Sequence, residues 1–124
     1  MERDVVLWID HRHAVIAAVS GGAEEMRHVQ SGVEKHVRFS ASEGGSEDGR
    51  DRRFEGHLNR YYDDVIAAIR DARSILILGP GEAKHEVEKR LRDTGLGNRL
   101  VAVETVDKMT DHQIAAEARK RFRE

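Results

Sequence analysis

The sequence has no cysteine and only one proline among its 124 residues. Disulfide scaffolds, thiolate zinc sites and thiol-redox centres are therefore excluded. Aromatic residues make up only 5% of the chain, and no apolar run approaches the roughly 18 residues of a membrane span. The N-terminus, Met-Glu-Arg-Asp, lacks the pattern of a signal peptide. We therefore expect a cytoplasmic protein with no membrane partner.

The sequence also lacks an excess of charge of either sign. Charged residues reach 35%, against about 25% in an average domain, yet the formal net charge is only -2. No overall basic field draws the chain to nucleic acid, so any RNA contact has to be local and depend on shape. The length fits a single domain over residues 1–124, which can bury about two-thirds of its unfolded surface.

The first thirty residues predict three strands. Residues 5–9 are apolar throughout and indicate a central strand over residues 4–10. A polar turn over residues 10–13 leads to a second apolar run over residues 14–19, as in an antiparallel hairpin. After two glycines, residues 24–30 alternate in polarity and predict a third strand near the sheet edge.

The next segment is poor in apolar residues. Lys35–Phe39 is a candidate short strand, but residues 43–53 contain no apolar side chain. Such a stretch cannot offset the entropy lost when it is ordered, so we expect a mobile loop over residues 42–53. Long loops of this kind often carry function.

The rest of the chain alternates helices and strands. Apolar residues at spacings of three and four predict a long amphipathic helix from Phe54 to Ala72, followed by a buried strand at residues 74–78. A helix begins at Ala83, and a strand is predicted over residues 99–106, followed by a last helix.

The ends of the last two helices have strong local signals. Gly95 suits the left-handed position after a helix, with Leu96 returning to Leu91 in a Schellman ending. Thr110 and Gln113 match a capping box before the last helix, and Met109 with Ile114 matches a hydrophobic staple. The resulting order, β-β-β-α-β-α-β-α, predicts a mixed α/β fold. It comprises one five-stranded mixed sheet with helices packed on it, antiparallel first and then parallel through right-handed crossovers.

Three stretches together resemble a known family: residues 6–12, the pair Tyr61 and Tyr62, and residues 75–84, which end in Gly-Pro-Gly-Glu-Ala-Lys. The chain resembles the central domain of archaeal and eukaryotic peptide-chain release factors and of their ribosome-rescue relative Pelota. It is similar above all to small stand-alone bacterial members described as translational machinery proteins. The resemblance covers nearly the whole chain and implies that domain's fold, with the ribosome, tRNA or rRNA as partner and no cofactor.

The resemblance also locates the family's chemistry. In release factors, a Gly-Gly-Gln loop before the long helix promotes hydrolysis of peptidyl-tRNA, and the matching residues here are Gly44, Gly45 and Ser46. The glutamine is missing, and nearby Glu43, Glu47 and Asp48 would repel phosphates. We therefore expect a ribosome- or RNA-associated domain rather than an enzyme, with a stand-alone peptidyl-tRNA hydrolase as an alternative.

Two groups of residues are candidates for anion or RNA binding. Gly79, Gly81 and Lys84 lie where a strand passes into a helix, and backbone N–H groups at a helix start can hold a phosphate. The other interpretation of this stretch is a plain strand-to-helix turn. Arg50, Arg52 and Arg53 form a short basic patch.

A second alternative is a metal-dependent nuclease. Asp10 at the end of the first strand is similar in place to an acidic residue of ribonuclease-H-like nucleases, whose sheet order is also similar. Such enzymes need several carboxylates around their cations, and Asp64 or Asp107 could join Asp10. The competing interpretation is that Asp10 is an ordinary turn residue. Likewise, the spacing of Tyr61 and Tyr62 favours core positions over a base-stacking platform.

Overall fold

The computed structural model describes the backbone of residues 3–32 and 47–122, and the side chains of this part except those of residues 47–55 and 57. Its elements are β1 (Asp4–Ile9), β2 (His13–Ser20), β3 (Ala23–Gln30), α2 (Glu47–Ile69), β4 (Ser74–Gly79), α3 (Ala83–Asp93), the short 3-10 helix η1 (Gly97–Arg99), β5 (Leu100–Thr105) and α4 (Asp111–Arg121).

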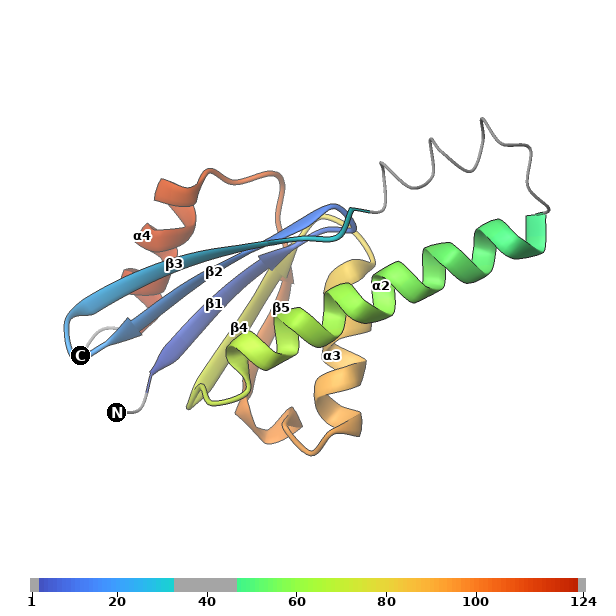
Figure 1. The fold of residues 1–124 in the computed structure, drawn as a ribbon. Helices are drawn as coiled ribbons and strands as arrows, with labels where there is room; N and C mark the ends of the chain where they lie inside the picture. The colour runs from blue at the N-terminus through green and yellow to red at the C-terminus, as the bar shows by residue number, and fades with distance from the viewer. Residues whose placement is uncertain (1–2, 33–46, 123–124) are drawn as a thin grey trace.

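The strands form one five-stranded sheet in the order β3-β2-β1-β4-β5 (Figure 1). β1, β2 and β3 are antiparallel neighbours, whereas β4 lies parallel to both β1 and β5. Parallel strands need a crossover connection, which the helices between β3, β4 and β5 provide. The predicted fold class, a mixed five-stranded α/β sheet, is confirmed.

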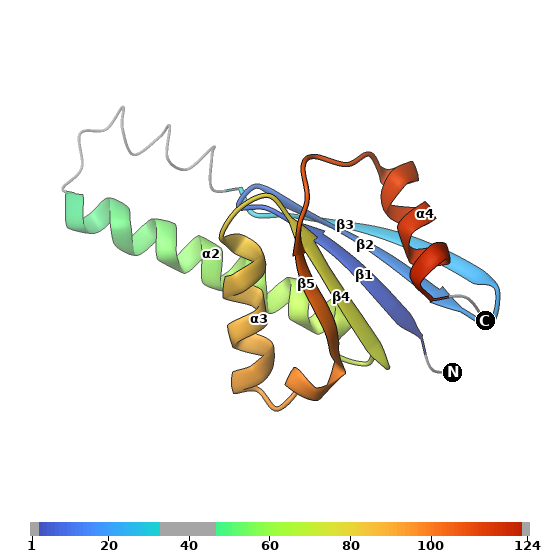
Figure 2. The same cartoon turned by 180° about the vertical axis from the view of Figure 1, so that it is seen from behind.

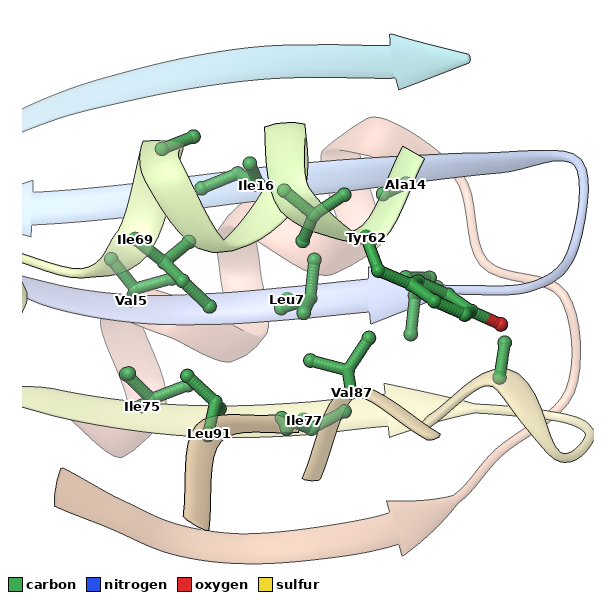
Figure 3. Packing of buried hydrophobic residues seen from close by; sticks show 14 of the residues in the cluster. Val5, Leu7, Ala14, Ile16, Tyr62, Ile69, Ile75, Ile77, Val87 and Leu91 are labelled. Atoms are coloured by element: carbon green, nitrogen blue, oxygen red, sulfur yellow. The ribbon is translucent and has the colours of Figure 1, made fainter. Parts of the chain in front are cut away.

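Helices cover both faces of this sheet. α2 and α3 lie on one face and α4 on the other (Figures 1 and 2). Alternate residues of the central strand β1 therefore enter two cores: Leu7 faces α2 and α3, and Trp8 faces α4. Figure 3 shows the larger core, where side chains of α2 and α3 meet β1, β2 and β4.

The predicted helix ends are confirmed. Gly95 has φ +82, its N–H donates to the carbonyl of Arg92 at 3.2 Å, and Leu96 donates to Leu91 at 2.7 Å, as a Schellman ending requires. Before α4, the Thr110 N–H donates to Gln113 Oε1 at 2.8 Å. The Gln113 N–H donates to Thr110 Oγ1 at 3.1 Å, which completes the capping box.

The expected start of the long helix is wrong. α2 begins at Glu47 rather than Phe54, so residues 47–53 are helical and not loop. Acids in a first turn favour helix formation because they oppose the positive end of the helix dipole, and Arg is a good helix former without any burial. Figure 1 shows this first part of α2 extending beyond the edge of the sheet. The remaining loop residues 42–46 and the candidate strand Lys35–Phe39 lie outside the described residues.

No helix in the described part of the chain is both long and apolar enough to cross a membrane.

Candidate functional site

The parallel strands β1, β4 and β5 all end at one side of the sheet, which we call the carboxyl edge. Ligand sites of open α/β sheets form at such an edge. The turn after β1, the Gly-Pro-Gly turn after β4 and the segment after β5 meet there. The N–H of Val106 donates to the Gly79 carbonyl at 3.0 Å, and Gly79 lies directly against Ile9. The structure thus brings together Asp10 and the Gly79–Lys84 turn, two candidates that lie far apart in the sequence.

Asp10 organises the turn between β1 and β2. Its Oδ1 accepts the backbone N–H groups of Arg12 and His13, each at 2.8 Å, and its own N–H donates to the His13 carbonyl at 3.1 Å. This is an Asx turn, in which a short carboxylate replaces a backbone partner. The geometry gives Asp10 a structural role in the hairpin.

Tyr61 links this turn to α2. Its hydroxyl donates to the Asp10 carbonyl at 2.9 Å, and its side chain is 1% exposed. Burial, followed by the negative charge of Asp10, raises the pKa of Tyr61 well above its ordinary value. Tyr61 is therefore a neutral hydrogen-bond donor at physiological pH, and its predicted core position is confirmed.

Gly79 is required by the close approach of the two central parallel strands. A Cβ atom at this position would lie 2.3 Å from the Ile9 carbonyl oxygen. At Gly81, by contrast, a Cβ atom would meet nothing within 4 Å in the described part of the chain. Of these two glycines, packing therefore explains only Gly79.

Lys84 closes the Gly-Pro-Gly turn from within. Its side chain is buried at 3% exposure, and its ammonium group donates to the Gly81 carbonyl at 2.6 Å. The charge thus lies against the turn that precedes α3 rather than extending from it. The Glu82 carbonyl accepts the N–H groups of His85 and Glu86, which begins the helix.

The side chains of His11 and Glu86 meet across the carboxyl edge. His11 Nε2 lies 2.8 Å from Glu86 Oε2, and both side chains are partly exposed. The His11 carbonyl also accepts the Ser31 hydroxyl at 2.7 Å. The two residues lie 75 positions apart, and no local motif connects a β-turn with a later helix, so the sequence alone carries no signal for this contact.

Tyr62 has the least satisfied polar group at this edge. Its side chain is 1% exposed, and its hydroxyl has no hydrogen-bond partner within the described residues. Burial first, and then the nearby Glu86 carboxylate, raise the pKa of Tyr62, while the Arg90 guanidinium opposes that shift. Arg90 lies over the ring, 4.9 Å from its centroid. Figure 3 shows Tyr62 at the end of the core nearest the carboxyl edge.

In the described part of the chain, Asp10, Asp64 and Asp107 do not form the carboxylate set of a nuclease. Asp64 lies exposed on α2, and Asp107 meets β1 through its backbone carbonyl, which accepts the Trp8 indole N–H at 3.2 Å. Among the described residues, no three acidic or histidine side chains are arranged to hold a metal ion.

Two sets of candidate residues are only partly located. Gly44, Gly45 and Ser46 lie outside the described residues. Arg50, Arg52 and Arg53 belong to the first turns of α2, and their side chains are outside the described part.

Comparison with known proteins gave matches only among solved structures: no family model and no curated protein matches the chain. The Pelota protein of Thermoplasma acidophilum superposes with a TM-score of 0.62 at 18% identity, covering 96% of this chain and 32% of Pelota. Pelota of Archaeoglobus fulgidus gives a TM-score of 0.60 at 18% identity, with 96% and 31% covered. The archaeal translation termination factor aRF1 gives 0.54 at 14% identity, with 96% and 38% covered.

These matches show a shared fold. They extend over almost all of this chain, which spans only about a third of the length of the proteins it matches. The release-factor and Pelota resemblance seen in the sequence therefore holds at the level of the domain fold.

Proposed function

We propose that this chain is a translation-associated domain that binds ribosomal or transfer RNA and does not hydrolyse peptidyl-tRNA. The observation behind this proposal is the fold shared over 96% of the chain with Pelota and with a translation termination factor. Because a fold hosts many functions, the surface chemistry has to support the assignment as well.

The projecting start of α2 supports RNA binding. This part extends beyond the sheet (Figure 1) and holds three arginines within four positions: Arg50, Arg52 and Arg53. Guanidinium groups suit phosphate oxygens in charge and in geometry. With a net charge of -2 over the whole chain and three acids, Glu47, Asp48 and Asp51, in the same segment, attraction to RNA depends on local pairing of these arginines with phosphate oxygens.

The absence of hydrolysis is supported by two features. The tripeptide Gly44-Gly45-Ser46 lacks the glutamine of the release-factor motif. At the carboxyl edge, the polar groups of Asp10 and Lys84 are engaged in holding turns together.

The proposal is tested first in cell lysates. We expect the chain to sediment with ribosomal particles at low salt in growing or starved cells, and to leave them as salt is raised. Its absence from ribosomal fractions under both conditions would contradict the proposal. A release assay with peptidyl-tRNA and ribosomes distinguishes the alternative: hydrolysis above the buffer level would identify a hydrolase instead.

The contribution of α2 is tested with the triple variant Arg50→Glu/Arg52→Glu/Arg53→Glu. A matched control replaces three exposed lysines elsewhere, Lys89→Glu/Lys108→Glu/Lys120→Glu, and changes the net charge equally. We expect only the α2 variant to leave the ribosomal fractions. Equal loss from both variants would point to net charge rather than to α2.

A further inference from the structure

We propose that two copies of this chain associate through β3, so that their sheets join into one continuous sheet. β3 lies at the edge of the sheet, next to β2 alone in the described part of the chain (Figure 1). It is eight residues long, and apart from Met26 and Val29 its side chains are exposed. A long edge strand presents unpaired N–H and C=O groups that can pair with another chain.

The hairpin geometry determines which backbone groups face outward. β2 and β3 are joined by Gly21 and Gly22, both with positive φ, so the flanking residues Ser20 and Ala23 form a hydrogen-bonded pair. Because hydrogen-bonded and non-hydrogen-bonded pairs alternate along an antiparallel ladder, the even-numbered residues of β3 direct their N–H and C=O groups outward. These are Glu24, Met26, His28 and Gln30.

A symmetric pair of β3 strands has few allowed registers. Two copies related by a two-fold axis perpendicular to the sheet are antiparallel, and residues opposite each other must lie on the same face. Each allowed register therefore places one residue opposite its own copy. Near the middle of the strand, the residue on the axis can be Met26 or one of its neighbours, Glu25 and Arg27.

The charges of β3 favour the register centred on Met26. In that register Glu25 lies opposite the partner's Arg27, and Glu24 lies opposite the partner's His28, while Met26 meets its own copy. The two-fold axis repeats each of these pairs. Centring on Glu25 or on Arg27 would instead place like charges directly opposite each other, which is destabilising. The strand is thus complementary to itself in one register and repulsive in its neighbours.

Existing side-chain contacts between β3 and α4 extend this complementarity. Glu24 already accepts from Arg119, and His28 lies 2.7 Å from Asp111. In the paired sheet these groups would form an alternating row on the α4 face: Arg119, Glu24, the partner's His28 and the partner's Asp111. On the opposite face, Arg27 makes no ion pair within the described residues and is available to the partner's Glu25.

The opposite edge of the sheet has no comparable pattern. β5 exposes Val101, at 57% of its surface, but its one charged residue, Glu104, is bound by Arg121 through two hydrogen bonds of 3.0 and 2.8 Å. A β5 pair would lack the charges that select a register. We therefore assign the contact to β3.

Sedimentation velocity of the full chain over a wide concentration range tests this proposal. We expect wild-type protein to reach twice the monomer mass of 14.0 kDa. Arg27→Glu, which places acids opposite acids in both symmetric pairs, should raise the dissociation constant about tenfold or more. The double variant Glu25→Arg/Arg27→Glu exchanges the two charges and should restore association.

Since Glu25 and Arg27 are exposed, these variants should fold like wild type, which circular dichroism checks. A wild-type chain that stays monomeric at every concentration would overturn the proposal. So would an unrepaired loss in the double variant, or dimers that respond to Val101→Lys on β5 and not to Arg27→Glu. None of these results depends on whether the chain binds ribosomes.

Discussion

Replacing Gly79 by alanine perturbs the centre of the sheet at a single point. The added Cβ atom would lie 2.3 Å from the Ile9 carbonyl oxygen, about 1 Å inside ordinary carbon–oxygen contact. The obstacle is backbone of the neighbouring central strand, so no side-chain rotation can relieve it. β1 and β4 have to separate locally, although Ile9 and residues 75–78 of β4 are almost fully buried.

The cost follows from the packing. Overpacking a dense core costs about 1–3 kcal/mol, and a backbone clash between paired strands places Gly79→Ala near the upper value. The matched control is Gly81→Ala, where the new methyl group meets nothing within 4 Å in the described part of the chain. The backbone of Gly81 does not have a positive φ, so alanine can adopt its conformation. Reduced freedom of the unfolded chain should therefore leave the control unchanged or stabilise it by about 0.4–1 kcal/mol.

Urea unfolding measures both variants, with Trp8, the only tryptophan, as a fluorescent probe in the adjacent strand. With a denaturant dependence of about 2 kcal/mol per molar for a domain of this size, Gly79→Ala should lower the midpoint by about 1.5 M. The midpoint of Gly81→Ala should stay level or rise. A Gly79→Ala midpoint equal to wild type would refute the inferred closeness of β1 and β4.

Three further changes follow from other parts of the structure. Gly95→Ala should cost about 1 kcal/mol, because φ at this position is +82 and only the backbone is strained; a midpoint equal to wild type in urea would contradict the Schellman ending. Arg73→Met removes hydrogen bonds of 2.6 and 3.1 Å from Asp4, whose side chain is 3% exposed. Leaving the buried Asp4 carboxylate without Arg73 should lower the free energy of unfolding by about 2–3 kcal/mol, which is below the full range for buried pairs because Arg73 is half-exposed. Calorimetric unfolding at neutral pH measures this loss. A loss smaller than the experimental error would show that Asp4 is hydrated. Above pH 10, stability should fall by about 1.4 kcal/mol per pH unit for each of Tyr61 and Tyr62, since their raised folded pKa values keep them protonated while the unfolded chain ionises. Tyrosinate absorbance at alkaline pH should therefore appear only together with unfolding, and its appearance in folded protein would contradict the burial of these hydroxyls.

Features with local causes could be predicted from the sequence. The capping box at Thr110 and the Schellman ending at Gly95 each depend on residues within six positions of one another, so local pattern and structure agree. The buried strand β4 was equally predictable, because four consecutive apolar residues exclude an exposed position. The antiparallel arrangement of the first three strands followed from their short connections, and the parallel arrangement of the last two followed from the helices that lead to them.

Features with distant causes could not be predicted. The start of α2 has no apolar residue, so periodicity could not reveal a helix that extends beyond the core. The contact of His11 with Glu86 joins groups brought together only by the parallel pairing of β1 with β4. Lys84 was placed in the right turn, but its burial depends on how α3 packs, and a residue-type pattern cannot distinguish an inward from an outward ammonium group.

The most direct test of the proposed function is a binding titration of purified chain with purified ribosomes over a series of salt concentrations. We expect the logarithm of the binding constant to fall linearly with the logarithm of salt concentration. The Arg50→Glu/Arg52→Glu/Arg53→Glu variant should bind more weakly, with the magnitude of its slope reduced by about two to three. Ribosome binding that is absent, or that is identical for wild type and this variant at every salt concentration, would contradict RNA recognition through α2.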